Sequence, residues 1–246
     1  GQASVTVTVL PSPNITVSGA TNYCQNGIIN LIATGGNTYH WSGPNGYTAT
    51  GNSISRQSAN TTMSGTYTVT VSNNDCTATV NTVVTVNPNP TATLSGTSSI
   101  CSGGTIALTA PAGATSYQWS GPNGFSANTG SNNTLNRTGA TTTMAGLYKV
   151  TVTNAGGCTA TASRSVSVNA PTTASITGAT SVCGNANVIL TATTAGVAYS
   201  WTGPGGFTAS SASINTTAIA GQYKVTVTGS AGCISTASKT VTVTAA

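Results

Sequence analysis

WSGPNGY at residues 41–47 returns as WSGPNGF at 119–125 and as WTGPGGF at 201–207. In each copy a cysteine precedes the motif, a Gly-x-Tyr-x-Val-x-Val stretch follows it, and a second cysteine comes after that stretch. The tryptophans that open the three copies are 78 and then 82 residues apart (119 − 41 and 201 − 119). A repeat of this length that holds several short strand patterns predicts a tandem array of three small β domains rather than one large fold.

Charged residues make up only 3% of the 246-residue chain, whereas about 25% is typical of proteins in general. The net charge of +5 comes from six Lys and Arg residues that are spread along the chain with no two adjacent. Nucleic-acid binding needs clustered basic residues. No apolar run approaches the ~20 residues that a membrane helix needs. We therefore expect no nucleic-acid partner and no membrane insertion.

The second unit shows the strand pattern of each repeat. Apolar and polar residues alternate at 106–110, at 117–119 and at 147–153, and Gly-Pro-Asn-Gly at 121–124 marks a turn. Further short strands are expected at 91–95, 98–100, 125–127, 134–136 and 158–168. Seven or so short strands with turn signals between them predict an all-β chain in which each repeat is a Greek-key β-sandwich.

The repeat resembles the immunoglobulin pattern, in which Leu-x-Cys is followed by a tryptophan and then by Tyr-x-Cys. Alanine and valine stand where that pattern has its two core cysteines, as Ala110 and Val150 do in the second repeat. The resemblance implies three tandem immunoglobulin-like domains, each with a core tryptophan and a tyrosine-corner tyrosine. These signature residues are Trp41, Trp119, Trp201, Tyr67, Tyr148 and Tyr223.

A more specific resemblance covers all three units. The composite pattern C-x-G … YxWSGPNGF … AGxYxVTVTxxxGC is similar to the Ig-like and PKD-like repeats of very large surface proteins of Bacteroidota. Those proteins include gliding-motility adhesins and other cargo of the type IX secretion system. The resemblance implies an extracellular, cell-surface location. The near absence of acidic residues departs from many such repeats and argues against calcium sites built from Asp.

Strand and linker patterns divide the chain into an opening segment and three repeats. Their bounds are 1–11, 12–87, 88–170 and 171–246. SVTVTVL at 4–10, followed by Pro-Ser-Pro, is similar to the last strand and linker of the first repeat, VVTVNPNP at 83–90. We interpret the opening segment as the final strand of a preceding repeat in a longer array. The alternative is that this strand completes a neighbouring subunit by strand addition.

Six cysteines at matched positions in small β units predict disulfides and an oxidising compartment. They are Cys24, Cys76, Cys101, Cys158, Cys183 and Cys233. Their spacing suggests bonds within each repeat, which would make Cys24–Cys76, Cys101–Cys158 and Cys183–Cys233.

An immunoglobulin-like topology favours a different pairing. It puts the two cysteines of one repeat at opposite ends of a strand of about seven residues, roughly 20 Å apart. A disulfide needs Cα atoms within about 7 Å. Head-to-tail stacking would instead pair Cys24 with Cys158 and Cys101 with Cys233. Cys76 and Cys183 would then bond to repeats beyond this segment. Both pairings stay open on the sequence alone.

The sequence lacks the groups that catalysis and metal binding need. Asp75 is the one acidic residue and His40 the one histidine, while acid–base catalysis needs paired titratable groups and a hydroxyl nucleophile needs a base. His40 directly precedes Trp41, so on a strand it points away from the core. Zinc and calcium sites need several His, Cys or acidic ligands. We expect no catalytic residue, no cofactor, no metal and no enzyme activity.

The expected function is that of a non-catalytic, disulfide-braced spacer in an extracellular adhesin stalk or surface filament. Its partners would be neighbouring repeats of the same chain or identical chains. The alternative is a carbohydrate-binding surface module that holds surface glycans on exposed aromatic rings. Tyr47, Phe125 and Phe207, directly after the turns, are the possible ligand-facing aromatics, although a residue there more often packs on the turn.

Overall fold

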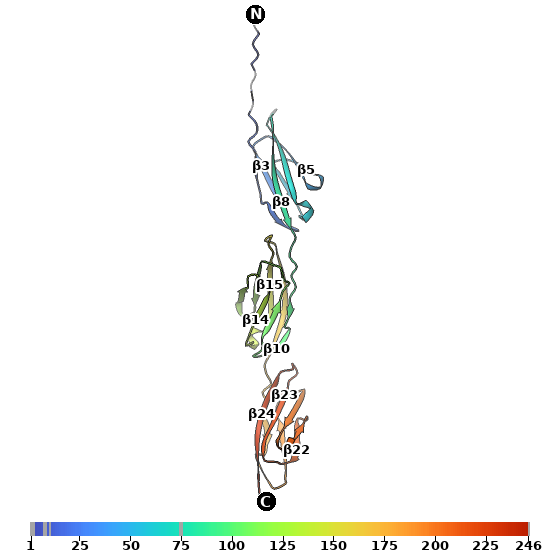
Figure 1. The fold of residues 1–246 in the computed structure, drawn as a ribbon, viewed down its shortest axis with the longest axis vertical. Helices are drawn as coiled ribbons and strands as arrows, with labels where there is room; N and C mark the ends of the chain where they lie inside the picture. The colour runs from blue at the N-terminus through green and yellow to red at the C-terminus, as the bar shows by residue number, and fades with distance from the viewer. Residues whose placement is uncertain (1–2, 7–8, 10, 74–75, 246) are drawn as a thin grey trace.

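Three β-sandwiches follow one another along a single long axis, with the two ends of the chain at opposite ends of the rod (Figure 1). The computed structural model describes residues 3–6, 9, 11–73 and 76–245. Each repeat packs a three-stranded sheet against a five-stranded sheet. The predicted all-β chain of three immunoglobulin-like sandwiches is therefore confirmed.

The strands keep the same order in every repeat. In the first repeat they are β1 (Thr16–Ser18), β2 (Asn22–Cys24), β3 (Ile29–Thr34), β4 (Thr38–Gly43), β5 (Tyr47–Thr50), β6 (Ser53–Arg56), β7 (Gly65–Asn73) and β8 (Cys76–Asn87). In the second they are β9 (Ser95–Gly96), β10 (Ser99–Cys101), β11 (Ile106–Thr109), β12 (Ser116–Gly121), β13 (Phe125–Asn128), β14 (Thr134–Arg137), β15 (Gly146–Thr153) and β16 (Thr159–Asn169). In the third they are β17 (Ile176–Gly178), β18 (Ser181–Cys183), β19 (Asn187–Ala192), β20 (Ala198–Thr202), β21 (Thr208–Ala209), β22 (Ser213–Thr217), β23 (Gly221–Thr228) and β24 (Ile234–Thr244).

In each repeat the chain passes between a small sheet and a large sheet. In the first repeat the small sheet runs β1-β3-β6 and the large sheet runs β2-β8-β7-β4-β5. Neighbours pair antiparallel except β2 and β8, which are parallel and place Cys24 opposite Asn87. The chain crosses from the small sheet to the large one at Gly19, whose φ is +139°. A β-carbon there would lie 2.4 Å from the carbonyl oxygen of Asn30, so only glycine fits.

The signature tryptophans and tyrosines lie in the three hydrophobic cores. Each tryptophan is at most 2% exposed, and its indole N–H donates to the return loop after the next strand, as from Trp41 to the Gly51 carbonyl at 2.9 Å. Each signature tyrosine donates its hydroxyl to the carbonyl four residues earlier, as from Tyr148 to Met144 at 3.0 Å. This is the tyrosine corner that the immunoglobulin resemblance implies.

Alanine and valine fill the space of the core disulfide. In the second repeat Ala110 is 4% exposed and Val150 is fully buried. Apolar burial therefore replaces the usual bond between the two sheets. The cysteines of this chain lie at other positions of the repeat.

Two details differ from the expectation. The strand predicted at 91–95 is reduced to β9, which pairs with β11 only through Ser95 and Gly96. In the opening segment, residues 3–6 and 9 are exposed and belong to no strand, while Val7, Thr8 and Leu10 lie outside the described residues. The last strands of the first two repeats end at Asn87 and Asn169.

Candidate functional site

Two disulfides join successive repeats. Cys24 bonds to Cys158 and Cys101 bonds to Cys233, with Cα atoms 5.5 and 5.6 Å apart. These are the two pairs that head-to-tail stacking predicts. Pairing inside single repeats is wrong for these four cysteines, because the two cysteines of a repeat stand at opposite ends of its sandwich.

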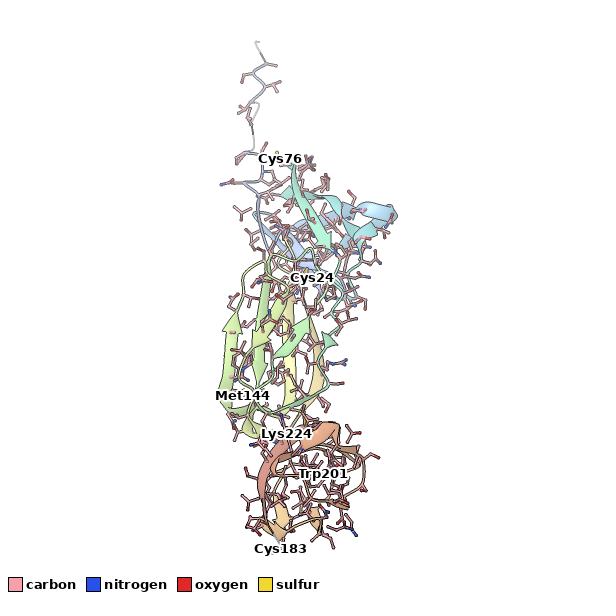
Figure 2. The ribbon with its side chains drawn as sticks, turned by 60° about the horizontal axis from the view of Figure 1, so that its bottom comes forward. Cys24, Cys76, Met144, Cys183, Trp201 and Lys224 are labelled. Carbon is pink, nitrogen blue, oxygen red and sulfur yellow. A yellow bond between two sulfur atoms is a disulfide. The ribbon has the colours of Figure 1, made fainter. Side chains whose placement is uncertain are left out.

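Strand register places the first cysteine of each disulfide. The parallel pairing of β2 with β8 brings Cys24 beside Asn87 at the lower end of the first repeat. The pairing of β10 with β16 does the same for Cys101 and Asn169 in the second repeat. Figure 2 shows Cys24 where the first repeat meets the second. Each bridge therefore starts where a repeat's last strand enters the linker.

A hairpin turn of the next repeat supplies the other cysteine. Cys158 follows the turn Asn154–Gly157 that joins β15 to β16, and it is only 1% exposed. The side chain of Asn154 accepts a hydrogen bond from the Cys158 N–H at 3.0 Å and donates to the Pro88 carbonyl at 2.8 Å. Asn89 donates to the Gln25 carbonyl at 3.1 Å. The linker is thus bound both to the repeat it leaves and to the repeat it enters.

The second junction has the same bridge with a different turn. Cys233 is 2% exposed. Gly229 takes the place of Asn154, and its N–H donates to the Cys233 carbonyl at 2.8 Å. Thr172 of the linker lies against Gly229, where a β-carbon would approach its Cγ2 to 2.7 Å. Packing of the linker replaces the asparagine hydrogen bond of the first junction.

The other two cysteines lie at the far ends of the array. Figure 2 shows Cys76 at the upper end of the first repeat and Cys183 at the lower end of the third. Cys183 is exposed and stands opposite Thr244 in the parallel pair of β18 and β24, in the register position of Cys24 and Cys101. Cys76 opens β8, just as Cys158 and Cys233 lie beside the first residues of β16 and β24.

The aromatic residues after the turns pack on the tyrosine corners. Tyr47, Phe125 and Phe207 are half-buried. Their ring centroids lie 5.8–6.3 Å from those of Tyr67, Tyr148 and Tyr223 in the same repeats. In the first two repeats a guanidinium also covers a ring face, with Arg56 4.2 Å from the Tyr47 centroid and Arg137 4.0 Å from that of Phe125. These rings therefore pack mainly against other side chains of their own repeat.

Sequence reasoning missed the two arginines. Arg56 and Arg137 each donate to the signature tyrosine hydroxyl at 2.6 Å while stacking on the other ring. Arg137 stands opposite Ile106 in the β11–β14 pair, and in the third repeat the matching position, opposite Val188, holds Thr216. Both arginines precede their tyrosine by 11 residues. That shared spacing in two repeats was the available signal.

The groups expected to be inert are spread apart. His40 is exposed on β4, next to buried Trp41. Among the described residues, His, Cys, Asp and Glu side chains form no cluster of three or more that could hold a metal ion. Asp75 lies outside the described residues. In the same described part of the chain, every helix is too short or too polar to cross a membrane.

Known proteins share this architecture. A family model described as a PKD-like domain matches residues 87–168, the span of the second repeat. The I-band fragment I67–I69 from titin superposes with a TM-score of 0.56 at 14% sequence identity, over 97% of this chain and 100% of the titin fragment. An E-to-A mutated variant of those titin domains gives 0.54 at 12% identity, over 96% and 100%. No curated protein is similar to the chain in sequence.

The repeats are of the immunoglobulin/PKD type. At these identities the likeness to titin shows the fold alone. An immunoglobulin/PKD-type sandwich is typically a structural domain. The candidate functional site of this chain is the disulfide-bridged junction between two such sandwiches. Its chemistry is covalent crosslinking of one repeat to the next.

Proposed function

We propose that the chain is a non-catalytic, disulfide-braced spacer in an extracellular stalk or surface filament. The single observation that supports this most is that both described disulfides join different repeats. A bond inside a sandwich stabilises that sandwich, whereas a bond across a linker holds the direction and length of the rod. Disulfides are typical of oxidising compartments, which supports an extracellular location.

The strand order supports a load-bearing part. Tension that enters a repeat through its first strands and leaves through its last strand pulls β2 and β8 in opposite directions. These strands are parallel neighbours, with Asn22, Tyr23 and Cys24 opposite Thr85, Val86 and Asn87. Their hydrogen bonds would therefore be sheared together rather than opened one at a time.

The bridges overlap in sequence, which limits extension. With both bonds intact, the shortest covalent route from Cys24 to Cys233 crosses to Cys158, runs back to Cys101 and crosses again. It contains about 57 residues (158 − 101) in place of 209 (233 − 24). At about 3.3–3.6 Å per residue, full extension is about 200 Å instead of about 700 Å.

Single-molecule stretching tests this proposal. The chain is pulled from its two ends with bridges intact, and again as a variant with Cys24, Cys101, Cys158 and Cys233 all replaced by serine. The intact chain should stop extending about 500 Å earlier than the variant. Equal final lengths under oxidising conditions would contradict the braced-spacer function.

The resemblance to Bacteroidota repeats favours a surface adhesin as the parent protein. Cys183 would then crosslink to a neighbouring repeat, either of the same chain or of an identical chain. A non-reducing digest of the protein isolated from its native surface would reveal peptides that join Cys183 to a cysteine beside a hairpin turn.

A further inference from the structure

A polar hollow of about 620 Å³ opens on the outer face of the first repeat. It lies where the loop before β4, the first half of β4 and the end of β5 meet. Residues 36–40 and 50–52 line it, and we call it the β4–β5 hollow. Neither the spacer function nor the bridged junctions use these residues. The volume lies in the range of small-molecule sites.

Hydrogen bonds to the core hold both walls in place. The Tyr39 hydroxyl donates to the Gly36 carbonyl at 2.8 Å and accepts from the Gly36 N–H at 3.2 Å. On the other side, Gly51 accepts from the Trp41 indole at 2.9 Å, and its N–H donates to the Tyr39 carbonyl at 3.1 Å. Because the walls are fixed before any ligand arrives, binding costs little ordering of the chain.

The hollow offers hydrogen-bonding side chains that the chain itself leaves unused. Thr38, His40, Thr50 and Asn52 are exposed, and their side chains make no hydrogen bond to any described residue. The lining also contains Asn37, whose amide donates to the Asn73 side chain at 3.2 Å. No Lys, Arg, Asp or Glu is among the lining residues. The chemistry suits a ligand with many hydroxyl groups and no formal charge.

The second repeat differs on the side of the wall that Thr50 and Asn52 form in the first. Its return from β13 to β14 runs over residues 129–133, whereas the first repeat returns over residues 51–52 alone. The longer return satisfies its own polar groups: Thr129 donates to the Asn132 carbonyl at 2.5 Å. The Asn132 side chain accepts from the Thr134 N–H at 3.0 Å.

The third repeat presents an apolar version of the same wall. By strand register, Val197, Ala198 and Ser200 stand where the first repeat has Asn37, Thr38 and His40. Val197 is 69% exposed. The hydrogen-bonding lining is therefore a property of the first repeat and not of the sandwich.

We propose that the β4–β5 hollow binds a neutral glycan of one or two sugar rings. Amide, imidazole and hydroxyl groups in a rigid frame match the alternating donors and acceptors of sugar hydroxyls. The site differs from the aromatic positions after the turns, whose rings are packed within the fold. A sugar site on the first repeat would let the spacer hold a polysaccharide at that point of the rod.

The test uses the full chain with its bridges intact. A panel of neutral mono- and disaccharides built from glucose, galactose, mannose and N-acetylglucosamine is titrated against labelled protein. His40 gives a single set of imidazole resonances, because the chain has one histidine. We expect these resonances and the backbone amides of 36–40 and 50–52 to shift with at least one saccharide.

The third repeat supplies a variant whose side chains the fold already accepts. Asn37→Val, Thr38→Ala and His40→Ser together convert the hollow to the third repeat's surface, and should weaken binding at least about tenfold. Gln118→Ser, at the His40 position of the second repeat, is the matched control and should bind as the parent does.

Three outcomes would overturn the proposal. They are the absence of shifts with every saccharide, shifts confined to residues outside 36–40 and 50–52, and equal binding by the triple variant. Unchanged amide spectra of first-repeat strands away from the hollow, β3 and β8, show that the triple variant has kept its fold.

Discussion

The backbone of Gly156 lies directly against the side chain of Asn87, so that a β-carbon at position 156 would be 2.5 Å from Asn87 Cγ. Gly156 belongs to the hairpin turn of the second repeat, and Asn87 ends the last strand of the first. The two residues flank the Cys24–Cys158 bond. The close approach seats the hairpin turn of the second repeat against the last strand of the first.

Gly156→Val should therefore hinder the first bridge. A branched side chain would push the turn away from Asn87 and separate Cys158 from Cys24, whereas the Cys101–Cys233 bond should form normally. Thiol titration and a non-reducing digest measure this. Ala155→Val, one residue earlier on an exposed position, is the control and should keep both bonds. Full bridging in Gly156→Val would show that the contact tolerates a side chain.

Arg137 should stabilise the second repeat through two contacts. It lies 4.0 Å from the Phe125 centroid and donates to the Tyr148 hydroxyl at 2.6 Å. Arg137→Gln removes the stacked cation, which is worth about 0.5–2 kcal/mol. We expect denaturant unfolding of this repeat to lose about that free energy. Lys149→Gln, on an exposed position of β15, should change it by less than about 0.5 kcal/mol.

The third repeat has a different residue at the position of the stacked arginine. The third repeat has Thr216 at the register position of Arg137, and the side chain of Ile219 approaches its turn, 2.9 Å from where a Gly205 β-carbon would be. That contact stands where Asn123 of the second repeat donates to the Thr143 carbonyl, and not at the position of the arginine. Threonine at position 216 also removes the hydrogen bond that arginine donates to the signature tyrosine in the first two repeats.

The fold could be predicted because the sequence contains the same core pattern three times, once in each repeat. Trp119, Tyr148 and their copies stand at fixed positions in strands of alternating polarity, and burial of one face leaves no other register. The disulfides between repeats could be predicted from the sequence only in part. Spacing alone favoured bonds inside a repeat, and a topology was needed to see that Cys101 and Cys158 lie at opposite ends of one sandwich.

The β4–β5 hollow could not be predicted. It depends on the length of the return between β5 and β6, two residues in the first repeat and five in the second. Polar residues such as His40 and Asn52 occur throughout the chain, so their type carries no signal. Only the three-dimensional arrangement shows that these side chains line one hollow.

Stability should be almost independent of salt. Charged residues are 3% of the chain, so screening of ionic interactions has little to act on. We expect the melting temperature to move by no more than about 2 °C between low sodium chloride and about 1 M. Sodium sulfate is the contrasting condition, because it strengthens apolar burial and should raise the melting temperature. A large shift in chloride would reveal ionic contacts that matter to the fold.

Loss of the bridges should affect the second repeat most. It is the one repeat that holds a cysteine of each described bond, Cys158 at its upper end and Cys101 at its lower end. Its unfolding is therefore restrained from both sides, whereas the first and third repeats are each restrained from one. A bridge of this kind typically contributes about 2–4 kcal/mol.

Hydrogen exchange of the core amides measures this difference repeat by repeat. On reduction, exchange of the β15 and β16 amides should speed up by about 30- to 900-fold, the range that corresponds to 2–4 kcal/mol. The variant Cys24→Ser with Cys158→Ser separates the two bonds. It should speed exchange in the first and second repeats and leave the third unchanged. Equal acceleration in all three repeats would mean that the bonds act on the array as a whole rather than on the repeat between them.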